Sequence, residues 1–319
     1  MPSLQKSDET PHKPPAWKVW VVAARPWALP ASTMPVVFGT SLAVVVGRAR
    51  LAPVRFVLAL VAMMVLHSAA NMLSDVFDFR RGLDRDVTPV SGAIVRGWLT
   101  DKAVAKGSAV LFAVGIGLGL LLAAATGWTL VWIGVMGVAV GASYTFLKAR
   151  ALGDLAVFLN FGILGGLGAW VVQTGTFSWI PVVWTVPMAM LVSAILHANN
   201  WRDIVSDGER RVRTFASILG DRGSLLYYGF LVFGSMAMIV GLMTIPRVAP
   251  GRLTAMPWTF VAVALALPRA LMLWGRAVRR RTPRQPLDFV ILDGATAQYN
   301  LLFGLLCTAA VWLAYALKV

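Results

Sequence analysis

Nine long apolar stretches decide what this chain can fold into. A helix that spans a bilayer needs roughly 20 predominantly apolar residues, and several of the stretches reach or exceed that length. Only 13% of the 319 residues are charged, about half the share of a soluble domain. The sequence therefore predicts an all-α, polytopic membrane protein. The predicted spans cover about residues 18–46, 54–74, 103–123, 126–146, 152–174, 180–200, 223–246, 255–275 and 294–317.

A polar, proline-rich segment precedes the first apolar stretch. The composition of residues 1–16 predicts a disordered tail, and the segment lacks the basic start and short apolar core of a cleavable signal. Residues 17–319 are expected to form a single transmembrane domain. Three prolines inside the first stretch, Pro26, Pro30 and Pro35, predict that its helix is kinked or interrupted.

Basic residues fall unequally on the two sides that the predicted spans define. Of the 29 lysines and arginines, 22 lie on the side of the N-terminus, six lie on the other side, and one lies within a span. Because these residues concentrate in cytoplasmic loops, the N-terminus is predicted to be cytoplasmic and the C-terminus to lie outside. Topology thus accounts for the net charge of +15, and no nucleic-acid partner is expected.

Two acidic motifs follow apolar stretches on the predicted cytoplasmic side, which also holds all 14 Asp and Glu residues. Residues 67–78 read HSAANMLSDVFD, and residues 197–207 read HANNWRDIVSD. Each motif places an Asn and two Asp three or four residues apart, so a helix would bring them to one face. Carboxylates at membrane-buried positions cost roughly 2.5–3.5 kcal/mol each on insertion scales, which indicates a function. The residues are Asn71, Asp75 and Asp78, and Asn199, Asp203 and Asp207.

The two motifs begin alike and lie four spans apart, which indicates a weak internal duplication. A parallel repeat would bring them face to face across a cavity. Paired carboxylates bind hard divalent cations through oxygen. Tyr144 and Lys148, four residues apart at the end of the fourth span, would share one helical face on the same side. Carboxylates with nearby lysine and arginine are what a magnesium-diphosphate complex requires.

The membrane setting narrows the substrate of such a site. A diphosphate at the cytoplasmic rim, with its organic part inside the bundle, indicates a long polyprenyl diphosphate. Small residues would either line an apolar tunnel or allow close helix packing, and packing is the preferred interpretation for each of them. These residues are Gly162, Gly165, Gly166 and Gly168.

Several motifs in this order resemble the UbiA superfamily of intramembrane aromatic prenyltransferases. Within it, the chain is most similar to the 1,4-dihydroxy-2-naphthoate polyprenyltransferases of menaquinone biosynthesis. Any one motif is weak, but the set covers nearly the whole chain. Besides the first acidic motif, it comprises ARPWALPASTMPVVFGT at 24–40, SYTFLKARALGD at 143–154, NNWRDIVSD at 199–207, RTFASILG at 213–220 and LDGATAQYNLLFGLL at 292–306.

The resemblance implies a nine-helix bundle with a central cavity open to the cytoplasmic side, in a bacterial inner membrane. It also implies Mg²⁺-dependent transfer of a prenyl group from a polyprenyl diphosphate to an aromatic acceptor. Arg202 matches an Arg of the naphthoate branch, and Tyr144 and Lys148 match the family's Tyr and Lys after the fourth helix. The residues implied to hold the Mg²⁺-diphosphate are Asn71, Asp75, Asp78, Asn200, Asp203 and Asp207.

In the resulting scheme the allylic diphosphate ionises, and Mg²⁺ and Lys148 stabilise the departing charge. Arg25 would pair with the carboxylate of the acceptor, although an ordinary positive-inside anchor is the preferred interpretation. No general base is assigned. Catalytic roles are expected for Lys148, Tyr144, Asp75 and Asp203; metal ligation for Asp75, Asp78, Asp203 and Asp207; and substrate binding for Asn71, Asn200, Arg202, Arg25 and Ser74.

Other polar residues receive simpler interpretations. Ser74 stands where the family usually has Asn, and Gly82 stands where some branches carry a third Asp; both departures leave the acceptor less defined. His67 and His197 are expected to be packed or hydrogen-bonded in the bundle. Helix N-terminal charge complementarity is preferred for three further carboxylates, Asp154, Asp288 and Asp293.

Three alternatives stay open. A cation-coupled transporter also uses intramembrane carboxylates, but it would need them near the bilayer midplane. A CDP-alcohol phosphotransferase also uses Asp and Mg²⁺, but its compact motif is absent. A UbiA-type enzyme with another acceptor, such as a homogentisate, a hydroxybenzoate, a haem or a lipid glycerol, is poorly separated by sequence.

Overall fold

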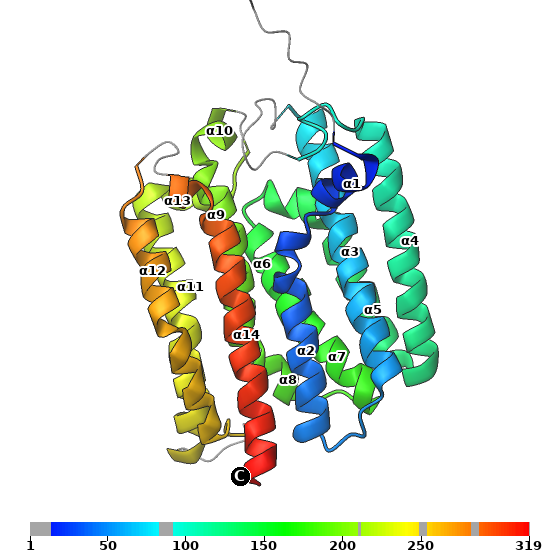
Figure 1. Ribbon diagram of the computed structural model, residues 1–319, viewed down its shortest axis with the longest axis vertical. Coiled ribbons are helices and arrows are strands. Elements are labelled where there is room, and N and C mark those ends of the chain that lie inside the picture. The colour runs from blue at the N-terminus through cyan, green and yellow to red at the C-terminus, as the bar shows by residue number, and fades with distance from the viewer. Residues whose placement is uncertain (1–13, 83–91, 210–211, 249–253, 282–286, 319) are drawn as a thin grey trace, which may run out of the picture.

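A computed structural model of the chain describes residues 14–82, 92–209, 212–248, 254–281 and 287–318 (Figure 1). Over these ranges every regular element is a helix, which confirms the all-α prediction. Residues 1–13 of the predicted tail lie outside the described part. The elements are α1 (Ala16–Ala24), η1 (Pro26–Ala28), α2 (Pro30–Val45), α3 (Pro53–Arg80), α4 (Asp101–Thr126), α5 (Trp128–Lys148), α6 (Gly153–Val157), η2 (Phe158–Leu164), α7 (Gly165–Thr174), α8 (Trp179–Trp184), α9 (Val186–Arg202), α10 (Ile204–Glu209), α11 (Phe215–Val248), η3 (Trp258–Ala266), α12 (Leu267–Val278), α13 (Leu287–Val290) and α14 (Leu292–Leu317).

Seven helical segments in the described ranges are long and apolar enough to cross a membrane. The bent pair Ala16–Ala28 and Pro30–Val45 adds an eighth if its two parts form one span. The span expected at 180–200 divides between α8 and α9, of which α9 has 17 residues. A polytopic membrane protein is thus confirmed, while the number nine stays a prediction. The seven segments are α3, α4, α5, Gly153–Thr174, α11, Trp258–Val278 and α14.

The interruption that the prolines predict lies between α1 and α2. Helix α1 ends at Ala24, Arg25 adopts a left-handed conformation with φ 54°, and the two helical segments meet at 56°. A residue before proline avoids the right-handed helical region, so Pro26 favours the end of α1. Pro30 occupies the first turn of α2, where no intrahelical N–H bond is needed. The break turns Arg25 toward α3.

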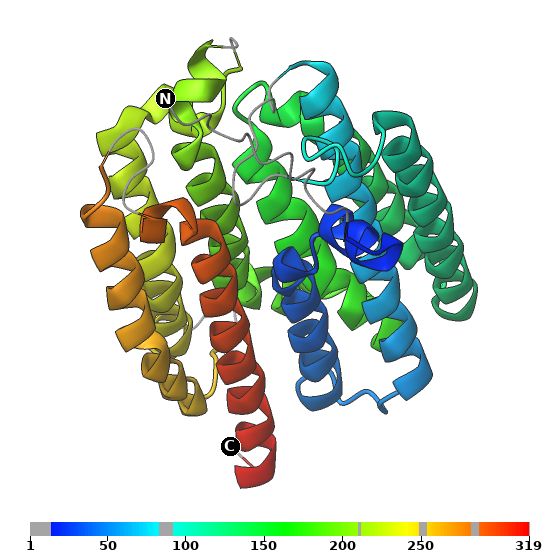
Figure 2. The ribbon, with the colours of Figure 1, turned by 45° about the horizontal axis from the view of Figure 1, so that its top comes forward.

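Helix α14 packs against both α2 and α9 and so joins the two groups of helices seen in Figures 1 and 2. On one side α9 packs against α11, and on the other α2 packs against α7 and α3 against α4. The main hydrophobic core runs between these helices and includes Phe38, Leu191 and Phe303. Elements α1, α10 and α13 lie at one end of the bundle, and the C-terminus lies at the other (Figure 1).

Glycines allow two close helix approaches in this bundle. A Cβ on Gly162 would overlap Ala189 of α9, and a Cβ on Gly166 would overlap the side chain of Thr185. The preferred interpretation of these two glycines as packing residues is therefore confirmed. A Cβ on Gly165 would lie 3.5 Å from its nearest neighbouring atoms, and a Cβ on Gly168 would lie 3.6 Å from Ile133. Both are ordinary van der Waals distances, so neither position requires a glycine for packing.

Gly39→Ala is expected to destabilise the protein by about 1–3 kcal/mol. A Cβ on Gly39 of α2 would overlap the backbone carbonyl of Gly166 in α7, and neither backbone can move away cheaply. Gly117→Ala in α4 is the matched control, because nothing lies within 4 Å of its Cβ position. Unfolding of both variants in detergent gives the comparison, and equal midpoints would contradict the close approach of α2 and α7.

Candidate active site

The first acidic motif occupies the last turns of α3, where neighbouring elements hold its side chains. Asp75 is buried and forms an ion pair with Arg25, the residue at the break after α1. Gly92 lies against it, since a Cβ there would be 2.5 Å from Asp75 Oδ2. Asn71 Nδ2 donates a 3.5 Å hydrogen bond to the carbonyl of Ala24. The proline break thus places Arg25 on a motif carboxylate, whereas a contact with the acceptor's carboxylate stays a prediction.

The other carboxylate of this motif faces α5. Asp78 Oδ2 lies 3.4 Å from Lys148 Nζ, and it accepts a 3.4 Å hydrogen bond from Ser74 Oγ. The side chains of Asp78 and Lys148 are 13% and 15% exposed, so solvent screens their attraction only weakly. Ser74, at the position of the expected Asn, therefore contacts the Asp78 carboxylate.

Arg202 connects the second acidic motif to the start of α14. Its buried guanidinium bonds Asp203 at 3.1 Å through Nη2 and at 3.4 Å through Nε. Nη1 donates to Asp293 Oδ2 and to the carbonyl of Val290, both at 3.0 Å. Asn199 Nδ2 donates to the same Asp293 oxygen at 3.2 Å. All three guanidinium nitrogens are thus engaged within the protein, and a substrate contact by Arg202 stays a prediction.

The expectation that a helix brings the second motif to one face is wrong at Asp203. Helix α9 ends at Arg202, and Asp203 leaves the helix with φ −98° and ψ 9° before α10 starts. Its N–H bonds the Asn200 carbonyl three residues back at 3.2 Å, which tightens the last turn. The side chains of the two neighbouring asparagines have different surroundings. Asn199 bonds Asp293 of α14, whereas Asn200 is buried.

Both acidic motifs share one cation, Lys148 at the end of α5. It pairs with Asp78 of the first motif and interacts electrostatically with Asp203 and Asp207 of the second. Tyr144, one helical turn earlier, interacts with Lys148 and Asp78. Two motifs far apart in the sequence therefore lie at one end of the bundle, within electrostatic reach of one ammonium group.

A sequence model of the UbiA prenyltransferase family matches residues 32–302. The chain belongs to this family. It is a prenyltransferase held in the membrane by its apolar helices.

Named relatives of this UbiA prenyltransferase match over almost the whole chain. A 1,4-dihydroxy-2-naphthoate octaprenyltransferase of Bacillus subtilis (strain 168) is 29% identical over 297 residues, or 91% of each chain. UbiA prenyltransferase domain-containing protein 1 of Homo sapiens is 30% identical over 314 residues, covering 93% of this chain and 84% of its own. A solved UbiA homolog from Archaeoglobus fulgidus bound to GPP and Mg²⁺ shares the fold, with TM-score 0.61, 13% identity and coverage of 91% and 99%.

This UbiA prenyltransferase offers oxygen ligands without a closed metal cage. Among the residues that the structure describes, no three His, Cys, Asp or Glu side chains form a group that would hold a metal ion. Mg²⁺ usually keeps several waters and binds through one or two carboxylates and substrate phosphates. The buried Oδ1 of Asn200 has no hydrogen-bond partner in the described ranges and is a further oxygen donor. This donor set fits Mg²⁺ that is held jointly with a diphosphate.

Sequence reasoning missed the side-chain partners of two carboxylates. Asp293 binds Arg202, and Asp154 Oδ2 lies 3.0 Å from His197 Nδ1 with both side chains buried. Complementing a helix N-terminus is therefore an incomplete account of either. The hydrogen-bonded interpretation is confirmed for His197 and also for His67, whose Nδ1 lies 2.8 Å from a serine hydroxyl. The available signal was a carboxylate inside a membrane-embedded sequence.

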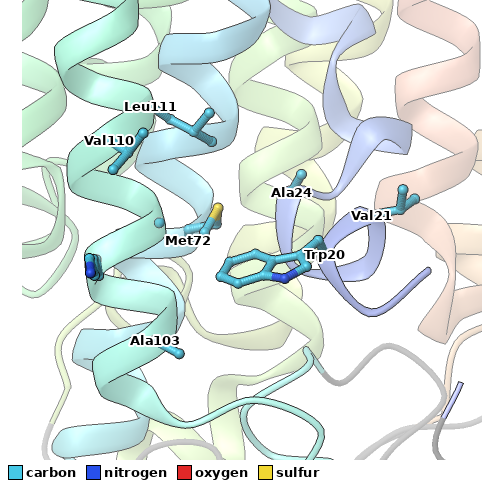
Figure 3. A pocket seen from close by; sticks show the side chains of 9 residues that line it. Trp20, Val21, Ala24, Met72, Ala103, Val110 and Leu111 are labelled. Carbon is cyan, nitrogen blue, oxygen red and sulfur yellow. The ribbon is translucent and has the colours of Figure 1, made fainter. Parts of the chain in front are cut away.

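An apolar groove of about 610 Å³ lies between α1, α3 and α4 (Figure 3). Figure 3 shows Trp20 of α1 and Met72 of α3 pointing toward each other beside α4. None of the predicted site residues lines the groove, so the carboxylate chemistry lies outside it. The lining consists of Trp20, Val21, Ala24, Met72, Ala103, Lys106, Gly107, Val110 and Leu111.

Proposed function

We propose that this protein transfers a polyprenyl group from an allylic polyprenyl diphosphate to 1,4-dihydroxy-2-naphthoate, with Mg²⁺ as its cofactor. The observation that carries the proposal is Lys148, which interacts with carboxylates of both acidic motifs at one end of the bundle. The named activity of the Bacillus subtilis relative supports the acceptor. The ligands of the Archaeoglobus fulgidus homolog support the diphosphate and the metal.

The proposed setting is a nine-helix bundle in a bacterial inner membrane, with a cavity that opens to the cytoplasm. The charge distribution supports a cytoplasmic N-terminus, since 22 of 29 basic residues fall on that side. The end of the bundle that holds α1, α10 and α13 would then be cytoplasmic, and the C-terminus would lie outside (Figure 1). Residues 17–319 would act as one domain behind the tail of residues 1–16.

The residues at this end would divide the work of binding and ionisation. Asp75 and Asp78 from α3, and Asp203 and Asp207 from the α9–α10 region, would ligate Mg²⁺, which supplies positive charge for the diphosphate when bound. Asn71 and Asn200 would contact the same complex. Lys148 would stabilise charge on the departing diphosphate.

Tyr144 and Arg25 have proposed roles next to the carboxylates. Tyr144 would orient Lys148, with which it interacts one helical turn away. Arg25 would hold Asp75 in place and also approach the carboxylate of the acceptor. Ser74 would orient Asp78 through the hydroxyl bond that it already makes.

The proposed reaction breaks one bond and forms another in a balanced way. The allylic C–O bond breaks, and its electron pair leaves with the diphosphate. The ring carbon that carries the carboxylate supplies the pair for the new C–C bond. That carboxylate then leaves as CO₂, which returns an electron pair to the ring, so no oxidant, reductant or external base is needed for this step.

An acceptor panel tests the proposed function. Purified protein receives a radiolabelled polyprenyl diphosphate, Mg²⁺ and one of four acceptors: 1,4-dihydroxy-2-naphthoate, 4-hydroxybenzoate, homogentisate or glyceryl phosphate. Prenylated naphthol and an equal amount of CO₂ are expected with the first acceptor. EDTA is expected to stop the reaction, and excess Mg²⁺ is expected to restore it. Prenylation of another acceptor alone would contradict the naphthoate assignment. Undiminished turnover in EDTA would contradict the proposed dependence on Mg²⁺.

A further inference from the structure

A buried pair, Asp154 and His197, joins α6 to α9. His197 Nδ1 lies 3.0 Å from Asp154 Oδ2, and the two side chains are 0% and 5% exposed. One turn earlier in α9, the Ser193 hydroxyl donates a 2.9 Å hydrogen bond to the Asp154 carbonyl. Two successive turns of α9 therefore contact both the backbone and the side chain of one residue at the start of α6.

The start of α6 is in turn fixed to Lys148. Helix α5 ends at Lys148, whose carbonyl accepts a 3.2 Å bond from the N–H of Ala151. Ala151 has a φ of 63°, an uncommon conformation for a residue other than glycine. A Cβ on Gly153 would lie 3.2 Å from Lys148 Cα and 3.4 Å from a methyl of Leu196 in α9. The start of α6 thus contacts both the end of α5 and α9, so the docking of Asp154 on α9 helps to position the end of α5.

Stability alone does not account for the Asp154–His197 pair. Within the described ranges, Asp154 Oδ1 and His197 Nε2 are buried without hydrogen-bond partners, and each such atom lowers the stability of a fold. Well-packed apolar residues often replace a buried polar pair without loss of stability. Polar residues in membrane-embedded segments indicate a function by default. The ring of Tyr227 packs edge-on against the His197 imidazole, with 4.7 Å between the ring centroids, and limits the orientation of the imidazole.

We propose that Asp154 and His197 are positioning residues that hold Lys148 at its place between the two acidic motifs. This inference rests on the proposed function. The pair sets the spacing of α6 and α9, so it sets the distance from Lys148 to Asp203 and Asp207. A displacement of about 1 Å at a reacting centre reduces turnover by up to about 10²-fold.

Two substitutions at His197 separate the hydrogen bond from the bulk of the ring. His197→Phe removes the donor, whereas His197→Asn keeps an amide N–H near the place of Nδ1. His197→Phe is expected to lower kcat about 10–100-fold with little change in the KM for the polyprenyl diphosphate. His197→Asn is expected to recover most of this loss. Equal losses in the two variants would show that only packing matters and would overturn the proposal.

A double variant tests whether the effect passes through Lys148. In a Lys148→Gln background, His197→Phe is expected to change kcat less than about twofold, because the group that it positions is gone. The same fold-loss in both backgrounds would mean that His197 acts independently of Lys148 and would overturn the inference. Single-turnover assays with radiolabelled substrate keep the slow variants measurable.

Tyr228→Phe is the matched control for losing a buried hydrogen bond between helices. The Tyr228 hydroxyl lies 2.7 Å from the Thr296 hydroxyl, joining α11 to α14. This control is expected to retain native kcat even if its melting temperature falls by as much as that of His197→Phe. A kcat loss equal to that of His197→Phe would overturn the specific role of the pair. Failure of the native protein to transfer any prenyl group would instead remove the proposed function itself.

Discussion

Replacing Asp203 with Asn is expected to lower prenyl-transfer turnover by about 10²–10³-fold. Asn retains the shape of the side chain but removes the negative charge that would hold Mg²⁺. Arg202, which Asp203 and Asp293 share in the native protein, would then leave excess positive charge at the proposed Mg²⁺ site. Asp75→Asn is expected to have an effect of the same order, since Asp75 is the buried carboxylate of the other motif.

The measurement for both variants is kcat against Mg²⁺ concentration with purified protein. Asp101→Asn is the matched control, because Asp101, at the start of α4, lies outside the two motifs and pairs with Arg80 of α3 at 2.9 Å. Exposed pairs of this kind contribute little, so the control is expected to stay within about twofold of the native turnover. Native turnover in either Asp203→Asn or Asp75→Asn would contradict the proposal that both acidic motifs bind Mg²⁺.

The sequence was sufficient for the membrane class and for the convergence of the two motifs. Apolar length predicts spans because backbone polar groups in lipid must bond within a helix. Helical spacing predicts which carboxylates share a face, and it held in α3, where Asp75 and Asp78 lie on the last turns of one continuous helix. It failed in the second motif, because α9 ends at Arg202 and the chain turns at Asp203.

The sequence did not predict which side chains pair with one another, since these pairs depend on which helices pack together. The break before Pro26 pairs Arg25 with Asp75, a partner that neither interpretation of Arg25, an acceptor contact or a positive-inside anchor, included. Arg202 pairs with Asp293 because α14 lies beside the end of α9, and its contact with the substrate stays a prediction. Such contacts join residues far apart in the chain, and nothing in local spacing encodes them. His197 and Asp154 belong to the same class, with α6 docked on α9.

Replacing Lys148 with Gln is expected to lower kcat by about 10²–10³-fold while the KM for the polyprenyl diphosphate changes less. Charge accumulates on the diphosphate as the allylic C–O bond breaks, so an ammonium near that site stabilises the transition state more than the ground state. In the proposed site Lys148 would have this role, because it interacts with Asp78 from one motif and with Asp203 and Asp207 from the other. Single-turnover release of labelled diphosphate measures the step directly.

Lys148→Arg separates charge from shape in this test. It retains a cation but replaces a compact ammonium with a planar guanidinium, so turnover between those of Lys148→Gln and the native protein is expected. Lys148→Gln also removes the positive charge that pairs with Asp78 and interacts with Asp203 and Asp207, and its melting temperature is expected to fall. Bound diphosphate substrate is expected to restore the melting temperature of Lys148→Gln but to leave its kcat low. If kcat recovered together with the melting temperature, folding would be the only defect. Native kcat in Lys148→Gln would show that Lys148 only holds the motifs together and that the departing charge is stabilised elsewhere.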